Sequence, residues 1–207
     1  MTHTVAGLTH GLFIPALLDA GFPVYPVNPK SVDRHRRASG AKTEQIDAYL
    51  LTKHGRAEVA DLRRLEPDSS IVQELKALTR DQESLIQSQT RLVNQLTACL
   101  KAYYPVALEL FAKLPQKSTL RFLQTYPSPQ AAMAASAEQI QQVLRQARHP
   151  NSTIVAAKIV ERVHQPHLQA DAVTTRTKSR LMLALVSQLL PLIEQIAQYN
   201  KEIAPLF

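Results

Sequence analysis

The feature that most constrains this chain is a seven-residue apolar repeat in its middle. Two series of positions, offset by four residues, recur between about residues 69 and 104. The first series is Ile71, Leu78, Leu85, Leu92 and Cys99, and the second is Leu75, Gln82, Gln89, Leu96 and Tyr103. This heptad pattern predicts one helix of ~35 residues whose seam packs on another helix as a coiled coil. Ordinary bundle packing is the alternative, and the two glutamines are expected to weaken the seam and help set its register.

A second long amphipathic helix is predicted over about residues 173–203. Its apolar positions alternate three and four residues apart, which is a helical period. Pro191 lies within this seam and is expected to kink the helix or end it early, because proline has no amide hydrogen. Between the two long segments, five prolines divide the chain into short helices. The long helices are expected to pack as an antiparallel hairpin or, equally, to pair with a second chain in a homo-oligomer.

Glycine is confined to the first part of the chain. All five glycines lie at or before residue 55, and none occurs in the remaining 152 residues. Because glycine serves tight turns, this abrupt stop predicts a passage from a mixed α/β region to a helical one. We place the boundary near Pro67, with one domain over residues 1–66 and a helical region over residues 67–207.

Four elements are predicted in the first region. Residues 11–20 form a short helix that Gly21 ends. Residues 22–28 contain two prolines and can form a strand only if it is short or at a sheet edge. Residues 29–38 and 44–53 are predicted helices, and the second is expected to end at His54-Gly55.

The charge of the chain favours a polyanionic partner. The formal net charge is +7, and residues 29–64 carry nine Lys or Arg against five Asp or Glu. Such a surplus favours nucleic acid over a membrane, although a solvated basic helix face explains it equally well. No apolar run approaches the ~18 residues of a membrane span. The N-terminus has no signal-peptide pattern, and the lone Cys99 fits a reducing compartment, so we expect a cytoplasmic protein without membrane contact.

Few residues are candidates for chemistry. Glu44 and Asp47 are three apart, share a helix face and could both approach one divalent cation, but most such pairs are solvated surface charges. His164 and His167 flank Pro166, which spoils a helical arrangement of the two imidazoles and makes a metal site improbable. Cys99 lies on the heptad seam, where a small buried side chain is expected.

Three sequence segments follow one another between residues 8 and 60. Val27-Asn28-Pro29 is followed by a basic stretch over residues 31–40 and by the string Lys42-Thr-Glu-Gln-Ile-Asp-Ala48. This order of segments resembles the IS-one-ten group of insertion-sequence transposases. In that family a V-N-P turn precedes a basic helix and a K-T-D-x-x-D-A motif. A long coiled coil follows in the family too, so the resemblance extends loosely to the C-terminus.

The resemblance implies a RuvC-like, RNase H-type nuclease domain with four acidic ligands for magnesium-type ions. The third acid corresponds to Glu44, where the family usually has Asp, and the fourth to Asp47. Family members cut and join DNA as oligomers, some guided by an RNA, and carry a second domain with a nucleophilic serine. The phosphate contacts of this chain are expected from Lys30, Arg34, Arg36, Arg37 and Lys42.

Parts of the family pattern have no counterpart in these residues. The second acid belongs near Gly7, where there is no carboxylate, and the first Asp or Glu of the chain is Asp19. The Pro-Gly-x-Gly signature of the second catalytic domain is absent, since no glycine follows Gly55. We therefore expect a mainly α chain with a partial RuvC-like α/β remnant at its N-terminus. It would be a truncated or degenerate, catalytically incomplete copy that binds DNA and associates through its coiled coil.

Two alternatives remain open. In the first, another chain supplies the missing acids and the second domain, so that the assembled protein is a full enzyme. In the second, the chain is a helical interaction protein with no nucleic-acid role, whose heptads drive self-association and whose charge serves solubility.

Overall fold

The computed structural model describes residues 4–6, 11–28 and 44–207, and it divides into two units, Met1–Val72 and Gln73–Phe207. The prediction of a mainly α chain is confirmed, because long helices dominate and the described strands are short. The predicted boundary near Pro67 is not tested by this division and stays a prediction. The helix predicted over residues 29–38 lies outside the described residues.

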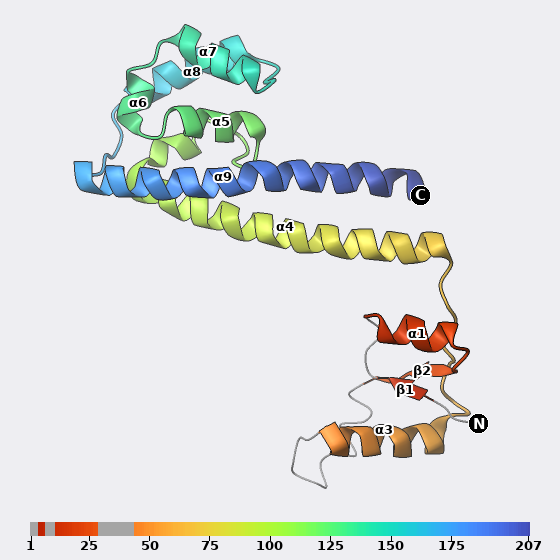
Figure 1. Ribbon diagram of the computed structural model, residues 1–207. Coiled ribbons are helices and arrows are strands. Elements are labelled where there is room, and N and C mark those ends of the chain that lie inside the picture. Colours follow the sequence, from red (N-terminus) through yellow and green to blue (C-terminus); the bar gives the residue numbers. More distant parts are fainter. Residues whose placement is uncertain (1–3, 7–10, 29–43) are drawn as a thin grey trace. The chain divides into compact units, whose positions relative to one another are not determined.

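The N-terminal unit contains a small βαβ arrangement. Strand β1 (Thr4–Ala6) pairs in parallel with β2 (Val24–Pro26), and helix α1 (Phe13–Asp19) lies between them in the chain (Figure 1). As predicted, α1 ends at Gly21, which has a φ of +79°. The amide of Phe22 reaches back to the carbonyl of Leu17 at 2.9 Å, as in a glycine-terminated helix.

Helix α3 (Glu44–Glu58) completes the N-terminal unit and packs beside β1. The prediction that it ends at His54-Gly55 is wrong, because the helix continues for four residues beyond His54. The His54 side chain is buried, and its Nδ1 lies 3.4 Å from Oε1 of Glu58, one turn further on. This packing outweighs the helix penalty of about 1 kcal/mol that glycine carries. Val27 and Leu50 form the small buried core between α3 and the end of β2.

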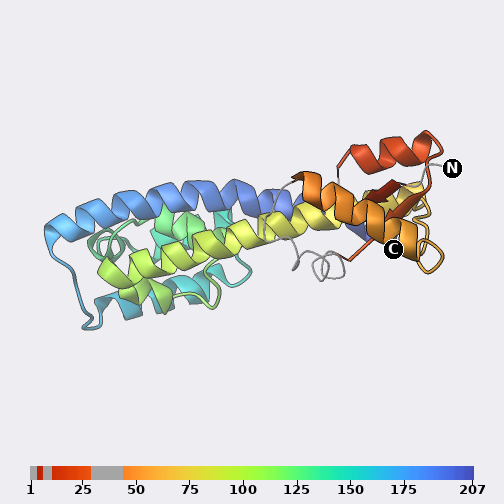
Figure 2. The same ribbon diagram turned by 90° about the horizontal axis from the view of Figure 1, so that it is seen from below.

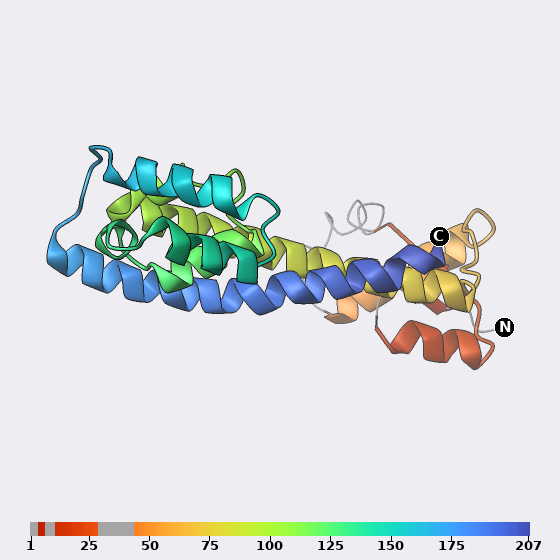
Figure 3. The ribbon, with the colours of Figure 1, turned by 90° about the horizontal axis from the view of Figure 1, so that it is seen from above.

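The second unit is built on two long helices, α4 (Ser70–Tyr103) and α9 (Ala172–Ile203). Both lie where the periodicity predicted them. Of the two arrangements left open, the structure has the antiparallel hairpin within one chain: Gln82 Nε2 donates to Asn200 Oδ1 at 2.7 Å, and Cys99 Sγ approaches the Lys178 carbonyl at 3.4 Å. Figures 1, 2 and 3 show the two helices side by side along their length. A seam glutamine thus pairs across the hairpin, as expected of a residue that sets register.

Pro191 does not end α9, contrary to one of the two outcomes predicted for it. The helix continues to Ile203. Pro191 removes the hydrogen bond that the carbonyl of Ser187 would accept four residues earlier. Both residues are exposed, so water can satisfy that carbonyl, and the cost of the missing bond stays small.

A helical insert of residues 104–171 connects the two long helices. It contains a 3₁₀ turn, η1 (Pro105–Leu108), and the helices α5 (Lys117–Thr125), α6 (Pro129–Met133), α7 (Ala137–Gln146) and α8 (Ser152–His164). The insert lies against the half of the hairpin that contains the end of α4 and the start of α9 (Figures 2 and 3). A second 3₁₀ turn, η2 (Ala204–Leu206), follows α9.

The insert decides which seam positions are buried. The seam residues Leu96, Cys99 and Tyr103 are buried where the insert covers the hairpin. Earlier in α4, Leu78 is half-buried and Ile71 is 55% exposed. The heptad seam therefore changes along its length from a two-helix contact to the core of a helical bundle. Knobs-into-holes packing of a true coiled coil stays a prediction.

Helix α9 also requires a correction to the hydropathy analysis. Over Ala172–Leu206 it is long and apolar enough to cross a membrane by length and composition, with a mean hydropathy of 1.4 in its best window. The helix contains no long unbroken apolar run, but the mean hydropathy of a window stays high when a few polar residues are scattered in it. Length and composition are weak evidence for a span, and Met182, Leu185 and Leu189 of this helix are buried in the core of the second unit.

Candidate functional site

The acidic pair lies at the start of α3. Glu44 is its first residue and Asp47 lies in its first turn, where the positive end of the helix dipole favours a carboxylate. Asp47 is half-buried and already has an interaction of its own. The spacing of three puts both residues on one helix face, as predicted, although the position of the Glu44 side chain is not among the described features.

A divalent ion needs more ligands than this pair provides. Two-metal phosphoryl transfer uses several carboxylates. Within residues 4–6, 11–28 and 44–207, no three His, Cys, Asp or Glu side chains gather closely enough to hold a metal. The described residues therefore do not form a metal centre on their own, and the role of Glu44 and Asp47 as ligands stays a prediction.

The predicted phosphate-binding residues lie outside the described part of the chain. Lys30, Arg34, Arg36, Arg37 and Lys42 all fall in residues 29–43. Among the described residues, α3 has exposed basic side chains at Lys53 and Arg56. Arg63 and Arg64, which follow the helix, are also exposed.

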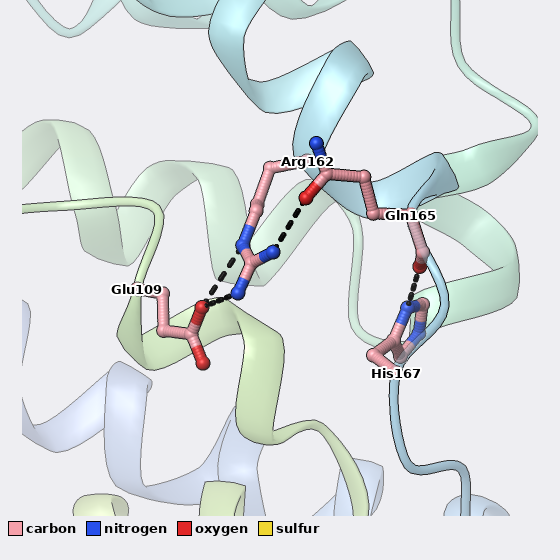
Figure 4. A network of polar contacts seen from close by, with 4 residues as sticks. All are labelled: Glu109, Arg162, Gln165 and His167. Atoms are coloured by element: carbon pink, nitrogen blue, oxygen red, sulfur yellow. Dashed lines mark hydrogen bonds and ion pairs between the residues drawn. The ribbon is translucent and has the colours of Figure 1, made fainter.

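The two histidines near the end of α8 do not share a ligand. His164 Nδ1 lies 2.8 Å from the carbonyl of Val160 in its own helix, and His167 Nδ1 lies 2.8 Å from the carbonyl of Gln165. Figure 4 shows the second contact beside an ion pair between Arg162 and Glu109. Arg162 Nε donates to Glu109 Oε2 at 2.9 Å and a second guanidinium nitrogen donates to Gln165 Oε1 at 2.5 Å. This network ties the end of α8 to η1 and is structural.

The cysteine and tyrosines of α4 are core residues. Burial raises the pKa of the Cys99 thiol, so the reactive thiolate is disfavoured. Tyr103 and Tyr104 are almost fully buried, and the Tyr103 hydroxyl donates to the carbonyl of Pro127 at 2.8 Å. Neither tyrosine can present a ring for a base to stack on.

A concave surface of the insert was missed by the sequence reasoning. A cavity of about 480 Å³ lies between α5 and α7 and contains two basic residues, Lys117 and Arg121. The signal in the sequence was the scarcity of acids: residues 110–160 contain six Lys or Arg and one acidic residue, Glu138.

Comparison with known proteins shows the family. The profile of the DEDD transposases of IS110 type, described as "Transposase", matches residues 3–105. The chain is 31% identical over 142 residues to a putative transposase, y4uE, of Sinorhizobium fredii, which covers 67% of this chain and 40% of that protein. It is also 31% identical over 106 residues to the mini-circle putative transposase for IS117 of Streptomyces coelicolor, covering 50% of this chain and 26% of that protein. No solved structure matches.

The chain belongs to the IS110 family of insertion-sequence transposases. The family match begins at residue 3 of the N-terminal unit, includes all of α4 and ends at the first residue of η1. The chain corresponds to less than half the length of these two relatives. A helical interaction protein with no link to transposition is not favoured by this membership.

Proposed function

We propose that this chain contributes DNA binding and subunit association to transposition, and that the 207 residues alone do not cleave DNA. The observation that carries the proposal is the family match over residues 3–105, which includes the basic segment, the acidic pair and the long helix α4. Family membership makes DNA the expected substrate. The N-terminal unit would be a partial RuvC-like domain, and its βαβ arrangement is compatible with that class of α/β fold.

DNA binding is assigned to the basic segment before α3. Lys30, Arg34, Arg36, Arg37 and Lys42 are five cations against one acid, Asp33, within 13 residues. Contacts of this kind neutralise phosphates and release counterions, so the affinity should fall steeply with salt and depend little on sequence. A structured RNA would bind the same cations by the same chemistry, and a guide RNA is a possible ligand of this segment.

The acidic pair would hold at most a weakly bound magnesium ion. Glu44 and Asp47 are the two carboxylates that correspond to family ligands, and Gly7 stands near the place of a third. Two carboxylates leave most of the coordination sphere of Mg²⁺ to water. Strand cleavage would then require further acids from another polypeptide. Exposed apolar side chains of the long helices, Ile86 of α4 and Leu181 of α9, offer contacts for a homo-oligomer.

The binding proposal is tested with the whole chain and a labelled DNA duplex at several salt concentrations. Replacing Lys30, Arg34, Arg36, Arg37 and Lys42 with alanine should reduce the salt slope by roughly four to five, since each lost phosphate contact removes about 0.9. Lys101→Ala with Lys201→Ala, at two exposed lysines of the other unit, is the control for lost positive charge. An affinity that is flat between low and moderate salt would refute phosphate binding.

The cleavage proposal is tested with supercoiled element DNA and magnesium or manganese. We expect no nicking by the wild-type chain. Nicking that Asp47→Ala abolishes would overturn the proposal, because it would show a working metal site in this chain.

A further inference from the structure

We propose that the helical insert carries a second DNA-binding surface, formed by the groove between α5 and α7, which contacts the phosphate backbone of a DNA duplex. The proposal goes beyond the binding assigned to the basic segment before α3, and it rests on the proposed function only in taking DNA as the substrate.

The groove is defined by its lining. It is formed on the α5 side by two cations, an amide and a hydroxyl, and on the α7 side by an amide and two small apolar residues: Lys117, Arg121, Gln124, Thr125, Val143, Gln146 and Ala147. Its volume of about 480 Å³ lies in the range of ligand-binding sites. All the polar groups that line it are donors, or amides and hydroxyls that can donate, and no carboxylate is among them.

The two cations of the groove lie on one helix face. Lys117 and Arg121 are four residues apart on α5, so their Cβ atoms lie about 6 Å apart and both side chains can contact one nucleic-acid backbone. Both are exposed. Arg121 already donates to Gln124 Oε1 at 2.8 Å, which holds the guanidinium against the helix without neutralising it.

Further positive charge lies next to the lining residues in the sequence. Arg145 and Arg148 flank the lining residues Gln146 and Ala147 in the sequence, and both are exposed. Arg148 has a φ of 60° and forms the turn that leaves α7, so the exposed cations belong to a defined helix end. The nearby opposing charge is Glu194 of α9, whose Oε1 accepts from Lys117 Nζ at 2.9 Å. Glu194 therefore competes with any anion for Lys117.

A duplex is favoured over a single strand because no ring lines the groove. Proteins that bind single strands without sequence preference use exposed aromatic side chains on which bases stack. The tyrosines nearest in the sequence, Tyr103, Tyr104 and Tyr126, are buried in the core. Lysine, arginine, amide and hydroxyl groups without an aromatic platform are typical of contacts to the phosphates and sugars of a duplex.

The test measures duplex affinity with the full chain at about 0.1 M salt. Lys117→Ala with Arg121→Ala should weaken binding about tenfold or more and reduce the salt slope by about two. Lys101→Ala with Lys201→Ala removes the same charge from exposed residues that do not line the groove and should change binding little. Glu194→Gln should tighten binding a few-fold because it releases Lys117, whereas Glu202→Gln should not. Equal effects of the groove pair and its control, or no gain from Glu194→Gln, would overturn the proposal.

Further measurements distinguish DNA binding by the groove from DNA binding by the basic segment, and a DNA duplex from other nucleic acids. If the basic-segment variant loses all binding and the groove pair binds like wild type, the groove is refuted and the proposed function stands. If the groove pair loses binding and the basic-segment variant does not, the groove stands and the earlier assignment fails. A single-stranded DNA or an RNA duplex that binds more tightly than the DNA duplex would refute the chosen ligand. The substitutions at Lys117, Arg121, Glu194 and their controls are at exposed positions. Unchanged thermal unfolding shows that each variant, the basic-segment variant included, is folded.

Discussion

The two units of this chain differ in how much of their structure their own core supports. Among the described residues, the second unit has 22 buried residues in one continuous cluster, whereas the buried cluster of the N-terminal unit consists of Val27 and Leu50 with a few half-buried neighbours. Yet the motifs that identify the family lie in the N-terminal unit. The sequence motifs of the family and the larger buried cluster therefore lie in different units of the chain. A family motif does not indicate which unit has the larger core.

The largest expected effect is the loss of stability caused by a core substitution, and it should differ between the two units. Phe122 of α5 is fully buried and stacks with Phe111 and Tyr126 at ring-centroid distances of 5.3 and 5.2 Å. Phe122→Ala should destabilise the second unit by about 3–5 kcal/mol, whereas Leu50→Ala should cost the N-terminal unit about 2 kcal/mol, since a loosely packed site collapses more easily. Urea unfolding followed by circular dichroism measures both. Equal losses would show that the N-terminal core is as well packed as the other.

A backbone effect of intermediate size is confined to the N-terminal unit. Gly21 has a φ of +79°, and no heavy atom of the described residues lies within 4 Å of the place where a Cβ would be added. Gly21→Ala should therefore cost about 1 kcal/mol from backbone strain alone. Gly21→Asn is the matched variant, because asparagine tolerates the left-handed conformation, and it should cost less. If both variants are as stable as the wild type in urea unfolding, the turn after α1 does not hold this conformation.

The smallest effect is a pH response of the second unit at the start of α9. Asp171 Oδ1 accepts from the amides of Val173 and Thr174 at 2.9 Å, and Oδ2 accepts from the Thr174 hydroxyl at 2.6 Å. The Thr174 hydroxyl, and then the backbone amides, lower the pKa of this carboxyl below its ordinary value of 3.8. The stabilisation is thus complete above that value and is lost as the pH falls through the lower pKa of the folded state.

Amide hydrogen exchange at Val173 and Thr174 measures this response. Exchange should speed up as the pH falls below about 4, after correction for the intrinsic rate. Asp171→Asn keeps a capping side chain without a titrating group and should show no such transition. The same acid profile in both proteins would show that the carboxylate does not cap the helix.

Much of the architecture could be predicted because the periodic positions are local in sequence. The heptads over α4 and the alternate spacing over α9 placed both helices to within a residue or two, and Gly21 ended α1 as expected. The end of α3 and the continuation of α9 past Pro191 could not be predicted in the same way. Both depend on surroundings: the burial of His54 in one case and the exposure of Pro191 and Ser187 in the other.

The candidate binding residues also differ in whether the sequence could predict them. The family motif identified Glu44 and Asp47 and the basic residues from Lys30 to Lys42, because those residues are close together in the chain. The groove of the insert could not be found this way. Lys117 and Arg121 come from α5, while Gln146 comes from α7, some 25 residues further on.

The sequence by itself determined the family, the positions of the two long helices and the surplus of positive charge. Each of these depends on residue identity or on local spacing. The tertiary structure decided that the seam of α4 packs on α9 of the same chain, and that the insert buries one half of that seam. It also brought α5 and α7 together around a cationic groove. These outcomes depend on contacts between residues far apart in the chain, because a heptad repeat specifies an apolar face but not the surface that covers it.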